Sequence, residues 1–285
     1  MAAPSAPAPS TAQRLRDFAV GIRPLAVIFA LLTAVSFLPS DTALREVNAA
    51  GRVSVCMPPD YPPLVLATGE RPGFDVELLQ EVADRSGWRL AIVSNSAMGR
   101  DFNPRSWRVT RAQCRILAGG LALSPTTRSF LDTTSGHLRT GWVMVADEGV
   151  PGLAAGTRVG FYPGLTGLDR VGLGQYLRGI GVETRLVPTA AALRQGLEDG
   201  SFDVAITEAL LAEQTFREAF WVTEWLPEDT GRYPVGIGFW RGDLTLRVHV
   251  ERMLATLARE GFVDELAAAY GLGDPVLCLG ASRSC

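Results

Sequence analysis

The chain has 285 residues, of which 47% are hydrophobic and 20% are charged, so it is long enough for one large or two ordinary domains with real cores. Its 30 acidic and 27 basic residues give a net charge of −3, which argues against nucleic-acid binding because that function needs an excess of positive charge. All the basic residues are arginines, which excludes chemistry that needs a lysine. The two histidines, His137 and His249, are far apart and have no cysteine nearby, so we expect no metal site and no cofactor.

The N-terminal segment has the pattern of an export signal. Residues 1–24 are rich in alanine, proline and serine and include three arginines, and residues 25–38 are a run of about fourteen nearly apolar residues. A basic segment ahead of a short apolar run is typical of a secretory signal, whereas a membrane span needs about twenty residues. We therefore predict that residues 1–40 are a signal peptide, with an uncleaved membrane anchor as the alternative.

Export changes the interpretation of the four cysteines, because an oxidising compartment permits disulfide bonds. Four cysteines can pair in three ways. Cys278 and Cys285 lie in a C-terminal tail and can close a small loop, and Cys56 and Cys114 flank the first strand–helix–strand stretch. The sequence does not choose among these pairings.

The first half of the chain alternates strand and helix patterns. A strand is predicted at 52–57, and residues 74–83 place their apolar side chains on one face of a helix. Further strands are predicted at 89–93 and at 115–118, the last of which runs into Gly119 and Gly120.

The second half repeats this alternation. The predicted elements are a strand at 157–162, a helix that ends at Arg178, a strand at 182–187, a helix between Thr189 and Gly200, a strand at 202–207 and helices at 243–260 and 262–270. Extended segments at 141–147 and 233–240 lie between the two blocks. Alternating strands and helices indicate a parallel sheet covered by helices, so the chain is predicted to be an α/β protein with two lobes, two connecting strands and a cleft.

Several strings between about residue 50 and residue 272 resemble, in order and spacing, the family 3 extracellular solute-binding proteins, which are the polar amino-acid receptors of ABC importers. The strings are VSVCMPPDYPPLV (53–65), RPGFDVELLQEVADRSG (71–87), LAGGLALSPTTRSFLDTT (117–134), GTRVGFYPGLTG (156–167), GSFDVAITEALLAE (200–213), VGIGFWRGD (235–243) and EGFVDELAAAYGL (260–272).

The resemblance implies a two-lobe periplasmic binding protein fold of type 2, with a parallel-type sheet and flanking helices in each lobe and two hinge strands. It implies a first lobe from residues 50–144 and 234–272, a second lobe from residues 145–233, and a tail at 273–285. The expected ligand is an amino acid or small carboxylate held between the lobes. The expected protein partner is an ABC permease of the inner membrane, and we expect a periplasmic monomer.

Two candidate ligand-binding residues follow the first strand. Asp60 and Tyr61 precede a proline that keeps Tyr61 extended, which can place its ring over the carboxyl edge of that strand. The resemblance implies that this aromatic ring covers the ligand, whereas the alternative is a tyrosine packed under a proline-rich loop.

Ser124 and Arg128 follow the third strand, where doubly wound sheets have their crevice. The planar fork of an arginine matches a carboxylate, and the resemblance assigns the α-carboxylate of the ligand to this arginine. The sequence departs from the family here, because an alignment without gaps puts Thr127 at the arginine position and Ala122 where a threonine or serine is usual. The alternative is an arginine in solvent at the start of a helix.

The second lobe supplies the other candidates. Gly164 and Thr166 are expected to open its first helix, where free N–H groups bind anions. Glu208 ends a buried strand at the position where the family has an aspartate for the ligand's ammonium; the alternative is a glutamate that stabilises a helix N-terminus. Arg128 and Glu208 are therefore expected to approach opposite ends of one zwitterionic ligand.

Two other functions on the same fold stay open. The segment 107–115 and the TTR at 126–128 also resemble binding-protein-like accessory proteins of periplasmic methanol dehydrogenases. Cyclohexadienyl dehydratases resemble these receptors as well, and in such an enzyme Glu208 would be a general acid. We predict a binding protein that catalyses no reaction.

Overall fold

The computed structural model describes residues 23–25, 27–31, 33, 41–98, 107–150, 152–163, 168–216, 221–273 and 276–278. Thr42–Cys285 forms one compact unit and Met1–Asp41 another. The described residues between 23 and 33 are helical. Within the described part of the chain, every helix is too short or too polar to cross a membrane.

Each lobe contains three parallel strands. In the first lobe, β1 (Arg52–Met57) lies between β2 (Arg89–Ser94) and β3 (Ile116–Ala122). In the second lobe, the central strand is β6, and its neighbours are β7 and β8; their bounds are Arg158–Phe161, Glu183–Leu186 and Val204–Glu208. The predicted parallel sheets are confirmed in both lobes.

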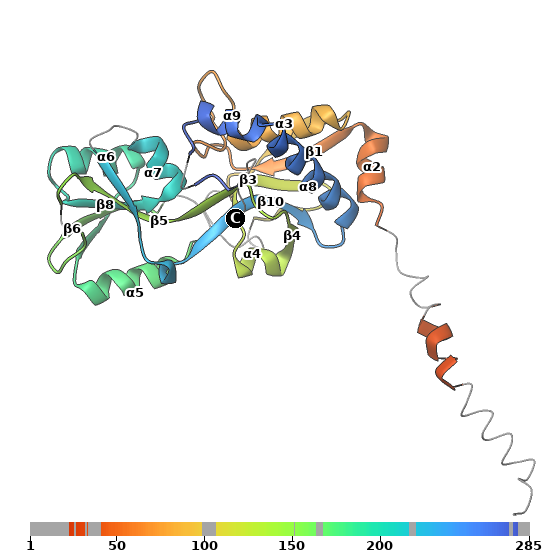
Figure 1. The fold of residues 1–285 in the computed structure, drawn as a ribbon, viewed down its shortest axis with the longest axis horizontal. Helices are drawn as coiled ribbons and strands as arrows, with labels where there is room; N and C mark the ends of the chain where they lie inside the picture. The colour runs from red at the N-terminus through yellow and green to blue at the C-terminus, as the bar shows by residue number, and fades with distance from the viewer. Residues whose placement is uncertain are drawn as a thin grey trace, which may run out of the picture. The chain divides into compact units, whose positions relative to one another are not determined.

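Two long strands continue from one lobe into the other. β5 (Leu138–Asp147) and β10 (Arg232–Trp240) are antiparallel to each other, β10 pairs with β3, and β5 pairs with β8. The resulting order is β2-β1-β3-β10-β5-β8-β6-β7, and Figure 1 shows β5 and β10 between the two groups of helices. The short strands β4 (Leu131–Thr133) and β9 (Trp221–Trp225) pair with β10 and β5. The predicted connecting strands are therefore present.

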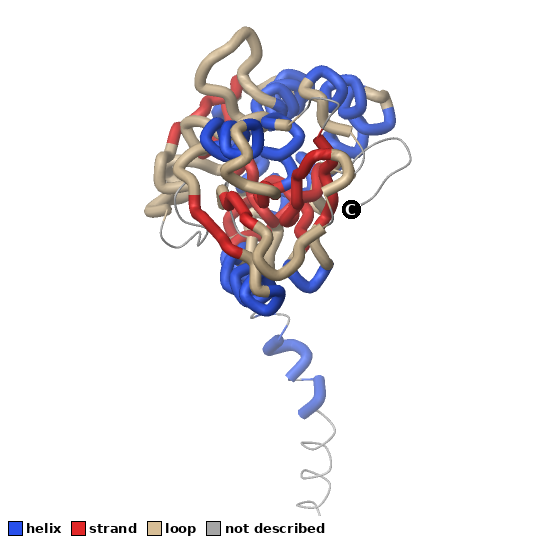
Figure 2. Tube along the Cα trace, turned by 90° about the vertical axis from the view of Figure 1, so that its left-hand side faces the viewer, coloured by secondary structure: helices blue, strands red, loops and turns tan. Residues whose placement is uncertain are grey.

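Helices flank the strands of both lobes (Figure 2). Those of the first lobe are α2 (Ala43–Ala50), α3 (Phe74–Arg85), α4 (Pro125–Phe130), α8 (Leu244–Arg259) and α9 (Phe262–Ala269). Those of the second lobe are α5 (Arg170–Ile180), α6 (Ala190–Glu198), α7 (Ala209–Thr215) and the 3₁₀ turn η2 (Glu228–Thr230). On α3, the predicted apolar face is buried, and Phe74 and Leu78 are both 0% exposed in the core of the first lobe.

Strand β3 extends four residues beyond its predicted end at Ala118. A β-carbon at Gly119 would lie 2.7 Å from Cδ of Pro58, and one at Gly120 would lie 2.5 Å from Cε1 of Tyr61. Both glycines have positive φ, +84° and +91°, which disfavours any other residue. The glycines therefore do not end the strand; they let the loop after β1 pack directly on it.

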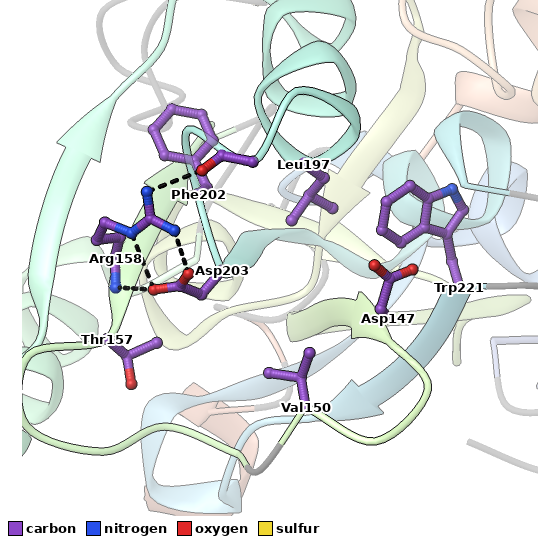
Figure 3. Close-up of a pocket in the computed structure, with 9 residues that line it drawn as sticks. Asp147, Val150, Thr157, Arg158, Leu197, Phe202, Asp203 and Trp221 are labelled. Carbon is purple, nitrogen blue, oxygen red and sulfur yellow. Dashed lines mark hydrogen bonds and ion pairs between the residues drawn. The ribbon is translucent and has the colours of Figure 1, made fainter.

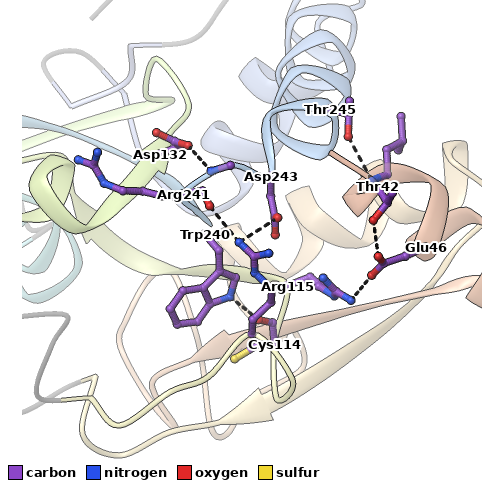
Figure 4. A network of polar contacts seen from close by, with 12 residues as sticks. Thr42, Glu46, Cys114, Arg115, Asp132, Trp240, Arg241, Asp243 and Thr245 are labelled. Carbon is purple, nitrogen blue, oxygen red and sulfur yellow. Dashed lines mark hydrogen bonds and ion pairs between the residues drawn. The ribbon is translucent and has the colours of Figure 1, made fainter. Parts of the chain in front are cut away.

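A disulfide bond joins β1 to the segment before β3, from Cys56 to Cys114. Cys278 is also disulfide-bonded, and Cys285 lies outside the described residues. Polar contacts surround the first disulfide (Figure 4): Nε1 of Trp240 donates to the Cys114 carbonyl at 2.7 Å, and Arg115 pairs with Glu46. The disulfide and these contacts hold the segment before β3 against β1, β10 and α2 of the first lobe.

The C-terminal tail runs beside the beginning of β5. Leu277 forms a bridge with Leu138, the Arg139 amide donates to the Val276 carbonyl at 2.7 Å, and the Cys278 amide donates to the His137 carbonyl at 3.1 Å. The tail thus adds hydrogen bonds at the point where β5 leaves the first lobe.

Candidate functional site

The carboxyl ends of the parallel strands in both lobes meet at one place. Tyr61 follows β1, Ser124 follows β3, and Glu208 is the last residue of β8. The Tyr61 hydroxyl donates a hydrogen bond of 2.7 Å to Oε2 of Glu208, and this hydrogen bond joins the two lobes. The structure therefore brings these two predicted residues from different lobes into direct contact.

Glu208 is fully buried and is the N-cap of α7. Its oxygens accept hydrogen bonds from the amides of Leu210 and Leu211, both at 3.1 Å, as well as from the hydroxyls of Tyr61 and Thr140. Burial raises the pKa of the Glu208 carboxyl, and these four donors oppose that effect because they favour the charged form. The helix-start interpretation of Glu208 is therefore confirmed, but its carboxylate also accepts a hydrogen bond from Tyr61 of the other lobe.

Tyr61 is held by its own loop. Its amide donates to the Val65 carbonyl at 2.6 Å, and its carbonyl accepts from the Leu64 and Val65 amides at 2.8 Å. The side chain is only 4% exposed, and its ring lies against Gly120 of β3. The tyrosine thus packs under the loop, and its hydroxyl reaches Glu208 of the second lobe.

Asp60 lies beside Tyr61 but has a local role. Its carboxylate is exposed and accepts a hydrogen bond of 2.9 Å from the Ala67 amide, which closes the loop after β1. Among the described residues, Asp60 is not one of the hydrogen-bond partners of Glu208.

Ser124 and Arg128 lie at the start and in the last turn of α4. Oγ of Ser124 accepts from the Thr127 amide at 3.2 Å, and the two side-chain hydroxyls are 3.1 Å apart. Arg128 is exposed, and its Nε donates to the Leu123 carbonyl at 3.0 Å. Thr127, which the gapless alignment places at the arginine position, is 2% exposed and is held by the serine.

Gly164 and Thr166 lie outside the described residues. Among the described residues, the first helix of the second lobe is α5, which begins at Arg170 and has Asp169 as its N-cap. The Asp169 carboxylate accepts from the Gly172 amide at 2.8 Å. Aspartate is among the preferred N-cap residues, and its charge is favoured at the positive end of a helix.

A buried pair in the first lobe was missed by the sequence analysis. Nε2 of His137 lies 2.7 Å from Oδ1 of Asp75, and Oδ2 of Asp75 accepts from the Gly119 and Gly120 amides at 2.8 and 3.2 Å. The His137 ring stacks on Phe74 and is 0% exposed. The pair ties α3 to β3 and to the residue before β5.

Among the described residues, a cavity of about 460 Å³ lies at the other end of the second lobe's sheet (Figure 3). Asp147 ends β5 and Trp221 begins β9 on one side of it, and Arg158 and Asp203 lie near the amino ends of β6 and β8. Arg158 and Asp203 pair with each other. Since Glu208 ends β8, this cavity and the contact between Tyr61 and Glu208 lie at opposite ends of the same strand.

Two α/β lobes, joined by two strands and facing each other at the carboxyl ends of their parallel strands, define a two-lobe periplasmic binding protein of type 2. Residues 53–273 match the bacterial extracellular solute-binding proteins, family 3, and the chain belongs to this family.

Solved structures of similar fold share little sequence with the chain. An ancestral cationic amino-acid solute-binding protein gives a TM-score of 0.66 at 17% identity, over 80% of this chain and 99% of that chain. A substrate-binding protein of an ABC uptake transporter from Streptococcus pneumoniae, with bound histidine, gives 0.62 at 15% identity, over 81% and 96%. An ancestral amino-acid-binding protein, described as a precursor of cyclohexadienyl dehydratase, gives 0.59 at 18% identity, over 80% and 99%. The comparison with curated proteins found no match.

Proposed function

We propose that this chain is an exported solute receptor that captures a small amino-acid-like or carboxylate ligand between its lobes and delivers it to an ABC permease of the inner membrane. The observation that carries the proposal is the hydrogen bond between Tyr61 and Glu208, since it marks where the carboxyl ends of β1 and β8 approach each other. A ligand bound at this position contacts both lobes, and its binding is coupled to their closure.

Arg128 is the proposed anchor for the ligand's carboxylate. The hydrogen bond from its Nε to the Leu123 carbonyl fixes one side of the guanidinium. Among the described residues, none pairs with its terminal amino groups through a hydrogen bond or an ion pair. Those groups are two donors in the planar geometry that a carboxylate accepts. Ser124, at the start of the same helix, is the proposed neutral contact, and Gly164 and Thr166 are proposed to contact the ligand from the second lobe.

The disulfide bonds support the periplasm as the compartment. Cys56 is paired with Cys114, and Cys278 is also disulfide-bonded. Structural disulfides persist in oxidising compartments and are rare in the cytosol. Together with the signal predicted at residues 1–40 and the family of extracellular proteins, they favour export of the receptor, which we propose to be a monomer.

The dehydratase alternative is less favoured by the same geometry. A general acid must reach the atom that it protonates. Both oxygens of Glu208 contact donors of the chain itself, from Tyr61, Thr140 and the start of α7. We therefore propose binding without catalysis.

The test is isothermal calorimetry of the purified protein with a panel of L-amino acids and small carboxylates. Arg128→Ala should weaken binding of every carboxylate that binds the wild type by roughly 10- to 100-fold, as expected for a charged hydrogen-bonded contact. Arg259→Ala is the matched control, because Nε of Arg259 also donates to a backbone carbonyl, that of Ala255, at 3.2 Å. Absence of binding by the whole panel contradicts the receptor function. An Arg128→Ala affinity within threefold of wild type places the anchor elsewhere.

A further inference from the structure

The cavity of about 460 Å³ in the second lobe combines a carboxylate with an aromatic ring. Asp147, the last residue of β5, and Trp221, the first residue of β9, are direct partners in the antiparallel register of these strands. Residues opposite each other in an antiparallel pair point to the same face of the sheet, with β-carbons about 4.5–5.5 Å apart. Figure 3 accordingly shows the Asp147 carboxylate beside the Trp221 ring, and both side chains line the cavity.

Asp147 is the only charged residue lining this cavity whose side chain has no partner among the described residues. The other two charged residues, Arg158 and Asp203, form an ion pair, in which Nε of Arg158 donates to Oδ2 of Asp203 at 3.2 Å. A terminal amino group of Arg158 also donates to the Gly200 carbonyl at 2.8 Å. One guanidinium and two carboxylates leave an excess of one negative charge, which lies on Asp147. The cavity therefore favours a cation over an anion.

The other walls of the cavity are apolar and firmly packed. They include Val150, Leu197 of α6 and Phe202, which precedes β8. The Phe202 ring fits between two glycines: a β-carbon at Gly160 would lie 2.4 Å from its Cδ2, and one at Gly196 would lie 2.1 Å from its Cε2. These close contacts hold the apolar wall in one position.

The geometry also indicates what kind of cation fits. A positive charge is attracted to the face of a tryptophan within about 6 Å of the ring centre, and the Asp147 carboxylate adds the opposite charge. The Trp221 ring packs against Phe216 with the ring centres 6.0 Å apart, which restricts its rotation. Among the described residues, no group of three or more acidic, histidine or cysteine side chains could hold a metal ion. An organic cation with apolar surface therefore matches this cavity better than a metal ion does.

We propose that this cavity is a second binding site, for a small organic cation such as a quaternary ammonium compound. The positive group lies between Asp147 and Trp221, and the apolar part of the ligand contacts Leu197 and Phe202. The lining residues all belong to the second lobe or to the end of β5. Binding here does not require the two lobes to approach each other, so the site is independent of the ligand proposed between them.

The experiment uses choline as the probe and 3,3-dimethylbutan-1-ol as its neutral control, in which a carbon atom replaces the charged nitrogen. Isothermal calorimetry on the purified protein should show that choline binds at least about tenfold more tightly than the alcohol, since only the cation is attracted to the carboxylate and the ring. A smaller ratio overturns the proposal, and so does an absence of choline binding up to about 10 mM.

Asp147→Asn tests the contribution of the charge. Asparagine keeps the size of the side chain, so choline affinity should fall by roughly fivefold, the upper value for an exposed ion pair, while the affinity for the alcohol stays the same. Glu148→Gln is the matched control, because Glu148 is the next residue, is also exposed and does not line the cavity. Choline binding that falls equally in both variants, or in neither, places the cation elsewhere and overturns the proposal.

Trp221→Leu tests the contribution of the ring. Leucine keeps an apolar side chain but has no aromatic face, so choline affinity should fall by roughly 3- to 30-fold. Trp225→Leu, at the other end of the same strand, is the control because Trp225 does not line this cavity. Equal choline affinity in the two variants contradicts the contact between the cation and Trp221.

Discussion

The two lobes use a buried carboxylate in different ways. Asp75, in the first turn of α3, and Glu208, at the start of α7, are 1% and 0% exposed, and each lies near the carboxyl end of a strand. Asp75 binds His137 and two glycine amides of β3, within the first lobe and its junction with β5. Glu208 binds only neutral donors, and one of them, Tyr61, comes from the other lobe.

Asp75 therefore stabilises the interior of one lobe, whereas Glu208 links the two lobes to each other. The partners of Asp75 keep their positions when the lobes move, because α3 and β3 belong to the same lobe. In the lobe closure that we propose, the hydrogen bond between Tyr61 and Glu208 breaks when the lobes separate and forms again when they close. One carboxylate therefore holds a lobe together, and the other reports whether the two lobes are in contact.

The largest expected effect follows from removal of the first carboxylate. Asp75→Ala leaves His137 and the amides of Gly119 and Gly120 without their acceptor in the core, which should lower the free energy of unfolding by roughly 3–5 kcal/mol. Urea denaturation measures this. Asp84→Ala on the same helix is the control, because Asp84 is exposed and a surface substitution should change stability by less than about 0.5 kcal/mol. A loss below about 1 kcal/mol for Asp75→Ala would mean that the pair does not stabilise the lobe.

Removal of the disulfide bond between Cys56 and Cys114 tests whether this bond stabilises the first lobe more than the second. Replacement of Cys56 and Cys114 together by serine opens a loop with a sequence separation of 58, which should lower the free energy of unfolding by about 2–4 kcal/mol. Hydrogen exchange should become faster in β1 and β3. Strands β6 and β8 are the internal control, since no cysteine occurs between residues 145 and 233. Equal acceleration in both lobes would contradict separate stabilisation.

The protonation of Glu208 should make the free energy of unfolding depend on pH. Burial raises the pKa of Glu208 above its ordinary value of 4.5, so the folded state holds the proton more tightly than the unfolded state does. Stability from this group is therefore complete below about pH 4.5 and falls as the pH rises toward the raised pKa, by at most about 1.4 kcal/mol per pH unit. Glu208→Gln cannot titrate. Unfolding experiments should show that wild type loses stability relative to this variant over that window, and a constant difference contradicts the prediction.

The parts of the fold that could be predicted from the sequence depend on local patterns. Thr189 and Gly200 mark the limits of a helix, and Thr189 does accept the amide of Ala192 as an N-cap. The order of strands and turns put Tyr61 after the first strand and Glu208 at the end of a buried strand, and only the family resemblance implied that the two residues face the same ligand.

The contacts that were missed join residues far apart in the chain. Thr140 and Glu208 are separated by 68 positions, and Asp75 and His137 by 62, so no window of the sequence contains both partners. The third strand was predicted to end at residue 118, where it runs into Gly119 and Gly120. Their actual role, close approach of the Pro58 and Tyr61 side chains, depends on a loop some sixty residues earlier.

The smallest expected change in stability comes from substitution of two helix N-caps, Ser124 and Thr189, which both accept a backbone amide through a hydroxyl oxygen. Ser124 accepts the amide of Thr127 in the first lobe beside Arg128, and Thr189 accepts the amide of Ala192 in the second lobe. Alanine at either position should lower the free energy of unfolding by about 1 kcal/mol, since one helix amide loses its acceptor. Only Ser124→Ala should also weaken ligand binding, by roughly 2- to 10-fold, the value of one neutral hydrogen bond. Denaturation and calorimetry on both variants separate the two roles. Equal ligand affinity in the two variants would mean that Ser124 is a helix cap and nothing more.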